Sequence, residues 1–174
     1  MKPRKMLNNW EAPCIQSLIK IIPTQSKTTL AHWAIDYAEE HLIPIWNKYY
    51  AQDERPFLAL EKARLWLAGQ LKLPQVKPAI LNCHEAAQEA AQHPIALAAA
   101  RAIGQCASTI HSARHCIGLV LYGALAIAYE QKGVDTKWEE LEDFANKECV
   151  KMEKALQRIA VVNETNPSNI DWKC

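Results

Sequence analysis

Two histidines lie four residues apart inside one of the most apolar stretches of this 174-residue chain. The stretch, residues 107–129, reads ASTIHSARHCIGLVLYGALAIAY, and the histidines are His111 and His115. Positions i and i+4 share one face of a helix, so the two imidazoles could bind a single metal ion. They could instead act on a substrate, or form hydrogen bonds inside a helical core.

A zinc ion would need at least one further protein ligand. The candidates elsewhere in the chain are His84, Cys83, Asp53 and Glu61. The metal motif is weak, because HSARH lacks the glutamate of H-E-x-x-H, and HEAAQ has glutamine where a second histidine should be. We therefore predict no metal ligand and no cofactor. Packed, hydrogen-bonded histidines are the favoured interpretation, and His84, His111 and His115 are the alternative metal candidates.

Catalysis would require a nucleophile beside a base. Three cysteines are close to histidines in the sequence, but neighbours on a helix point about 100° apart. Buried thiols in apolar surroundings are usually inert. Ser108 precedes His111 by three residues, yet no nucleophile elbow or oxyanion loop surrounds it. We therefore expect no enzymatic activity.

A helix continuous through residue 112 would carry one polar line on an otherwise apolar surface. The line would be Arg101, Gly104, Ser108, His111, His115, Gly118 and Tyr122. Because a buried unpaired polar group costs about 1 to 3 kcal/mol, other helices must supply partners. We predict a partly buried cluster in which Arg64, Glu61 and His84 meet the two histidines. The whole candidate ligand site or polar cluster is Asp53, Arg55, Glu61, Arg64, His84, Ser108, His111, His115 and Tyr122.

Helix signals recur along the chain, whereas alternating strand patterns and hairpin turns are nearly absent. We predict an all-α fold, a single domain of residues 1–174, with about seven helices around an alanine-rich apolar central helix. The ends, residues 1–12 and 163–174, are expected to be irregular, although Ile170 and Trp172 could dock the C-terminal tail.

Local signals set the expected helix ends. Pro44 should limit the helix that begins near residue 27, since proline removes a hydrogen-bond donor. Thr136 and Glu139 form a T-x-x-E capping box for the last helix. The stretch 93–133 is too long for one ordinary helix, so we expect a break or bend near residues 112–116 and an end at Gly133.

Bulk composition excludes several classes of partner. A formal charge of +1 and a pI near 7.6 provide no basic field for nucleic acid. The longest apolar run has 14 residues, short of the ~20 that span a bilayer, and no signal-peptide pattern follows the N-terminus. Six scattered cysteines without a CxxC pair indicate reduced, mostly buried thiols. We expect a cytoplasmic protein that binds neither nucleic acid nor membrane.

Four motifs carry a family resemblance from about residue 10 to the end. They are D-x-R-P at residues 53–56, A-R-x-W at 63–66, the lone His84, and T-x-H-x-x-x-H at 109–115. With the surrounding stretches, they resemble an all-helical bacterial family labelled putative immunity proteins, linked to polymorphic toxin systems. The resemblance implies a small cytoplasmic binder that neutralises a toxin protein by masking it. The alternative is a metal- or small-ligand-binding helical protein, and the oligomeric state stays open.

Overall fold

The computed structural model describes residues 3–172, and the part it describes is helical, without a strand. About 74% of the chain is helix. The α-helices are α1 Pro13–Ile21, α2 Lys27–Tyr37, α3 Ile43–Tyr49, α4 Arg55–Leu67, α5 Leu73–Glu89, α6 Pro94–Ser108, α7 Ala124–Lys132 and α8 Trp138–Ile159. Because α2 continues into α3, these helices form seven rods. The predicted all-α fold is confirmed.

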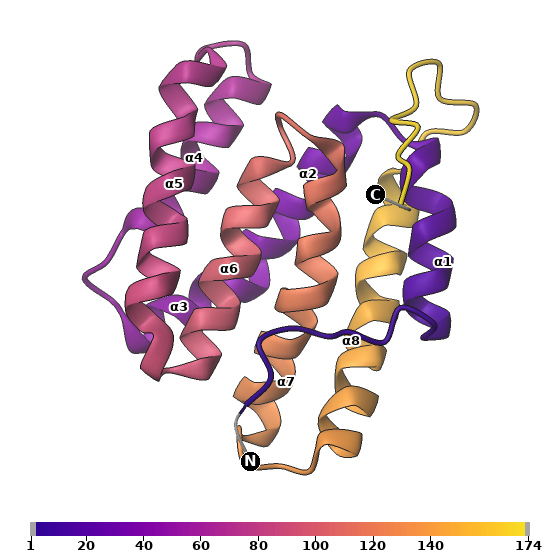
Figure 1. Cartoon of the computed structure of the whole chain (residues 1–174). Helices are drawn as coiled ribbons and strands as arrows, with labels where there is room; N and C mark the ends of the chain where they lie inside the picture. Colours follow the sequence, from indigo (N-terminus) through magenta and orange to yellow (C-terminus); the bar gives the residue numbers. More distant parts are fainter. Residues whose placement is uncertain (1–2, 173–174) are drawn as a thin grey trace.

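Helix α6 lies at the centre of the bundle and packs against α2, α3, α4, α5 and α7 (Figure 1). Eleven of its 15 residues are buried, and six of those are alanines. Alanine favours the helix and leaves room for neighbouring helices to approach closely. Large buried side chains on the surrounding helices, such as Trp33, Trp46 and Leu60, fill the remaining space. The predicted alanine-rich central helix is therefore present.

The chain reverses direction after α6. Ser112 is extended, with φ −142° and ψ 114°, and a 3₁₀ turn at Ala113–Cys116 follows it. A π-helical turn at Leu119–Gly123 then leads into α7, which runs back along α6 (Figure 1). Helix α7 ends at Gly133, whose φ is 89°. The predicted break and the predicted end are both confirmed.

The reversal overturns the expected single polar line. Its first part, Arg101 to Ser108, lies on α6, and its last part, Gly118 to Tyr122, lies on the returning segment. A Cβ built on Gly118 would approach the Cβ of Gln105 to 2.3 Å, so the two segments touch here. The prediction of one polar line was wrong because helical periodicity holds only while the helix continues.

Pro44 does not end its helix. The π-helical turn Ala38–Leu42 joins α2 to α3, and the backbone N–H of Ile43 donates to the carbonyl of Ala38, five residues earlier. A π turn shifts the hydrogen-bond pattern by one residue and so relieves the clash that proline causes in an ordinary helix. The expectation from Pro44 is therefore wrong.

The capping box at Thr136 is also absent. The Thr136 hydroxyl donates to the carbonyl of Lys132 at 2.6 Å, so it satisfies the end of α7. Helix α8 begins at Trp138 after Lys137, without a side-chain cap. The competing acceptor at the end of α7 explains why the local motif failed.

The N-terminal segment crosses α7 and α8 (Figure 1). The backbone N–H of Leu7 donates to the carbonyl of Leu121 at 2.9 Å, inside the π turn. The Tyr129 hydroxyl donates to the carbonyl of Arg4 at 3.0 Å, and the Arg4 guanidinium lies 3.9 Å above the ring of Trp138. These contacts fix the segment, although residues 3–12 contain no helix.

The C-terminal tail is held by the buried Gln25. Its side-chain oxygen accepts from the backbone N–H of Val161 at 2.7 Å, and its carbonyl accepts from that of Ser168 at 2.8 Å. The Trp172 indole donates to the carbonyl of Ile19 at 3.2 Å. The tail is therefore docked on the loop after α1, and Trp172 takes part as the sequence suggested.

The described cysteines, Cys14, Cys83, Cys106, Cys116 and Cys149, are all buried free thiols. This agrees with the prediction for these five, whereas Cys174 is outside the described residues. Among residues 3–172, no helix has the length and apolar character that crossing a membrane requires.

Candidate functional site

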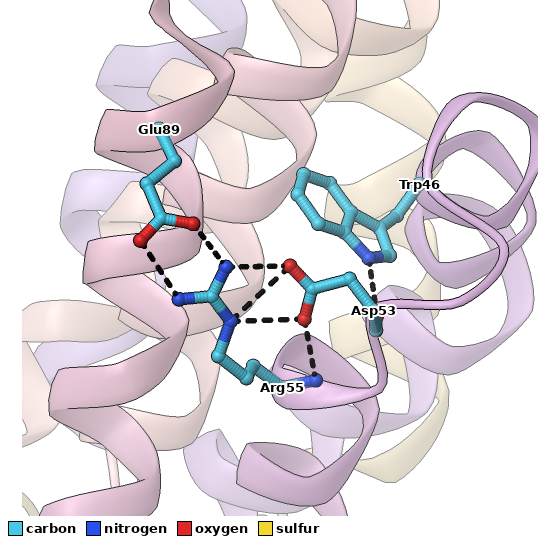
Figure 2. A network of polar contacts seen from close by, with 4 residues as sticks. All are labelled: Trp46, Asp53, Arg55 and Glu89. Carbon is cyan, nitrogen blue, oxygen red and sulfur yellow. Dashed lines mark hydrogen bonds and ion pairs between the residues drawn. The ribbon is translucent and has the colours of Figure 1, made fainter.

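The D-x-R-P motif builds an ion-pair network before α4, named here the Arg55 network (Figure 2). Arg55 donates from Nε and Nη2 to the Asp53 carboxylate at 2.9 and 2.7 Å. Its Nη1 and Nη2 also reach the two oxygens of Glu89 on α5. The Trp46 indole on α3 donates to the carbonyl of Asp53 at 2.7 Å. One guanidinium therefore ties the loop after α3 to α4 and α5.

Charge pairing dominates this network. The hydrogen bonds from Arg55 hold the pKa of Asp53 below its usual range, and those to Glu89 lower the pKa of that carboxyl too. Asp53 also accepts from the backbone N–H of Arg55 at 3.1 Å, at the start of α4, where negative charge is favoured. Because its opposite charges pair with one another, the network has a structural role: it holds the loop after α3, α4 and α5 together.

Arg64 belongs to a second ion pair, between α4 and α2. Its Nε donates to Glu39 at 2.9 Å, and its Nη2 reaches both Glu39 and Asp36. The structure thus joins Arg64 to carboxylates of α2 and the π turn after it, in place of the expected histidines. Glu61, the other expected partner, is exposed and forms no hydrogen bond or ion pair within the described residues.

The histidines meet elsewhere, at the end of α6. We define the histidine cluster as His84, Arg101, Gln105, His111 and His115. The Nδ1 of His115 lies 2.8 Å from the side-chain oxygen of Gln105, and the rings of His111 and His115 are 5.0 Å apart. The α6 reversal creates this arrangement, because it brings the 3₁₀ turn back against α6.

His84 reaches the cluster from α5 and packs on Gly104. A Cβ on Gly104 would lie only 2.5 Å from the Cε1 of His84, so glycine is what admits the ring. The Nδ1 of His84 is buried and has no hydrogen-bond partner within residues 3–172. The space at Gly104, which a small ligand or a backbone could have used, is therefore filled by a histidine that keeps one unused nitrogen.

All three histidines have pKa values below their ordinary range, and burial is the main cause in each. Every charged group that adds to these shifts is cationic or a histidine. The groups are Arg101 and His115 for His84, Lys77 and Lys27 for His111, and His111 and Arg114 for His115. The three histidines therefore stay largely neutral at neutral pH and lie in positive surroundings.

The geometry gives little support to a metal site, to a pair of Ser108 and His111, or to a reactive thiol at Cys83. In the part of the chain that the structure describes, no three His, Cys, Asp or Glu side chains are grouped to hold a metal ion. The Ser108 hydroxyl donates to the carbonyl of Gly104 at 2.7 Å, so it does not pair with His111. Burial raises the pKa of Cys83 to about 12, which keeps this thiol protonated.

The remaining predicted residue, Tyr122, is half-buried in the π turn and forms no hydrogen bond within residues 3–172. Sequence reasoning missed Gln105, which lies four residues after Arg101 on the same face of α6. It also missed Glu89, the second partner of Arg55. Helical spacing could have shown that Arg101 and Gln105 share a face of α6, but only the reversal shows that His115 contacts Gln105.

Comparison with known proteins supplies the family. The family model described as Imm-5 like putative immunity protein matches residues 20–155, well over half of the chain. The match contains the Arg55 network and the histidine cluster, and it confirms the resemblance carried by the motifs. No curated protein and no solved structure matches the chain. The chain belongs to the Imm-5 like family of putative immunity proteins.

Proposed function

We propose that this protein binds a cognate bacterial toxin in the cytoplasm and neutralises it by masking its surface. The family match over residues 20–155 carries the proposal, because an immunity family implies a toxin partner in general. The Arg55 network and the docked termini support it, since a body fixed in this way loses little conformational freedom on binding.

The α4–α5 pair supplies a suitable contact surface, which we call the α4–α5 face. The two helices pack together at one edge of the bundle (Figure 1). Phe57 and Leu58 on α4 are 47% and 37% exposed, and Leu81 on α5 is 67% exposed. Exposed aromatic and apolar side chains are typical anchors of protein interfaces. We therefore assign toxin contact to this face.

Co-expression tests the proposal. The product of the neighbouring gene is expressed alone and together with this protein, and cell growth is measured. We expect the wild-type chain to restore growth and to co-elute with the toxin in size-exclusion chromatography. Failure of the wild-type chain to rescue growth, or to form a complex, would overturn the proposed function.

Matched variants then test the face. Phe57→Asp and Leu81→Asp should weaken rescue, because each buries a charge against the partner. Val150→Asp is the control, since Val150 is also exposed, at 40%, but lies on α8. Thermal unfolding should show the three variants equally folded. Full rescue by both α4–α5 variants would place the contact on another surface.

A further inference from the structure

Three observations point to a ligand in the histidine cluster. The first is that the side chain of Arg101 lacks a partner in the described part of the chain. It is half-buried on α6, and its guanidinium forms no hydrogen bond or ion pair within residues 3–172. Arg55 and Arg64, by contrast, each bind two carboxylates. A guanidinium offers planar donors that fit the oxygens of a carboxylate or a phosphate. Arg101 therefore has unused capacity for an oxyanion.

The second observation is the buried Nδ1 of His84, which lacks a partner. His84 and Arg101 lie on facing helices, and the charge of Arg101 lowers the pKa of His84. Imidazole can donate from Nδ1, either in one neutral tautomer or after protonation. An oxyanion beside Arg101 would give this nitrogen the acceptor that it lacks.

The third observation is the charge around the cluster. Lys27 and Lys77 act on His111 from α2 and α5. An anion in the cluster would therefore be attracted from two sides.

Five of the carboxylates on neighbouring elements are paired elsewhere or exposed. Asp53 and Glu89 bind Arg55, and Asp36 and Glu39 bind Arg64. Glu85 follows His84 directly, about 100° around α5, and is exposed. The positive charge of Arg101 is thus not balanced by these carboxylates and is available to an external anion.

We propose that the histidine cluster is a binding site for an oxyanion, held between Arg101, His84 and His115. The exposed His111 lies at its solvent side, and Gly104 lies beneath the ring of His84. The ligand is a phosphate or carboxylate group small enough to fit beside the imidazoles. This site goes beyond toxin masking and does not depend on it.

A histidine titration by NMR tests the site on the full chain without a toxin. The pKa values of His84, His111 and His115 are measured with and without inorganic phosphate at constant ionic strength. A bound anion within about 4 to 6 Å favours the protonated ring, so the pKa values of His84 and His115 should rise by about one unit. Unchanged pKa values, with phosphate and in the acetate series described next, would overturn the proposal.

Variants of Arg101 and a second anion, acetate, test the site further. Arg101→Gln should abolish the rise, and Arg101→Lys should weaken it, since lysine keeps the charge but loses the planar fork. Arg158→Gln, an exposed arginine on α8, is the matched control and should respond like the wild-type chain. An equal rise in Arg101→Gln would overturn the proposal. A parallel series with acetate identifies the source: a response to both anions indicates a carboxylate ligand, and a response to phosphate alone indicates a phosphorylated one.

Discussion

The Arg55 network and the histidine cluster lie at two places along α5, at Glu89 and at His84. Each combines an arginine with partly buried polar groups from neighbouring elements. In the Arg55 network, one guanidinium donates to two carboxylates, and the backbone N–H of Arg55 also donates to Asp53. In the cluster, Arg101 has no carboxylate within the described residues, and the Nδ1 of His84 has no acceptor.

This difference separates a structural role from a binding role. Hydrogen bonds between paired charges offset the loss of hydration on burial, so these pairs stabilise the fold. An unpaired buried polar group costs stability, which natural proteins tolerate mainly where a function needs the group. The comparison therefore supports a structural role for the Arg55 network and the proposed binding role for the histidine cluster.

The largest expected effect concerns the two glycines beside the cluster. Gly118→Ala would place a Cβ 2.3 Å from the Cβ of Gln105, which is fixed to the backbone, so α6 and the returning segment must separate. We expect a loss of about 2 to 3 kcal/mol in the free energy of unfolding. Gly104→Ala meets only the ring of His84, which can turn away, and should cost about 1 kcal/mol. Urea denaturation measures both, and equal losses would show that the ring of His84 is as immobile as the backbone.

The next largest effect tests whether Arg55 and Arg101 differ in their contribution to stability. Arg55→Gln removes the hydrogen bonds to the half-buried Asp53 and should lower the free energy of unfolding by about 1 to 2 kcal/mol after solvent screening. Arg101→Gln removes no hydrogen bond within the described residues and should change it by less than about 0.5 kcal/mol. Denaturant titration of the two variants distinguishes them. A loss at Arg101 as large as that at Arg55 would show that Arg101 also has a structural role.

The smallest effect is a pH dependence that differs between the two regions. His84, His111 and His115 have folded-state pKa values below their ordinary 6.5, so the unfolded chain takes up protons first as the pH falls. Their contribution to stability is complete above pH 6.5 and is lost as the pH falls from that value toward the folded-state pKa values.

Asp53 acts in a lower range. Arg55 holds its pKa below the ordinary 3.8, so its contribution is complete above pH 3.8 and is lost only in stronger acid. Denaturation followed from neutral pH downward should therefore show two separate losses of stability. His84→Gln should reduce the first and Arg55→Gln the second. A single loss below pH 4 would show that the histidines titrate alike in the folded and unfolded chains.

Local sequence patterns predicted much of the fold. Apolar periodicity predicted the helices, and Gly133 predicted the end of α7. These predictions succeeded because hydrophobic spacing and positive φ act within one or two turns of the chain.

The failures involve competition between distant groups. Pro44 stays within a helix because a π turn absorbs it, and Thr136 bonds the end of α7 in place of capping α8. Each local signal was real, but another hydrogen-bonding arrangement satisfied the backbone.

The sequence by itself determined that the chain is helical, that α6 is an apolar central helix, and that its polar residues need partners. Only the tertiary structure decided which partners they obtained. Arg64 pairs with carboxylates of α2 and of the π turn after it, and the reversal after Ser108 brings His115 to Gln105. Pairing across the fold depends on which helix faces meet, and that follows from the packing of all the helices together.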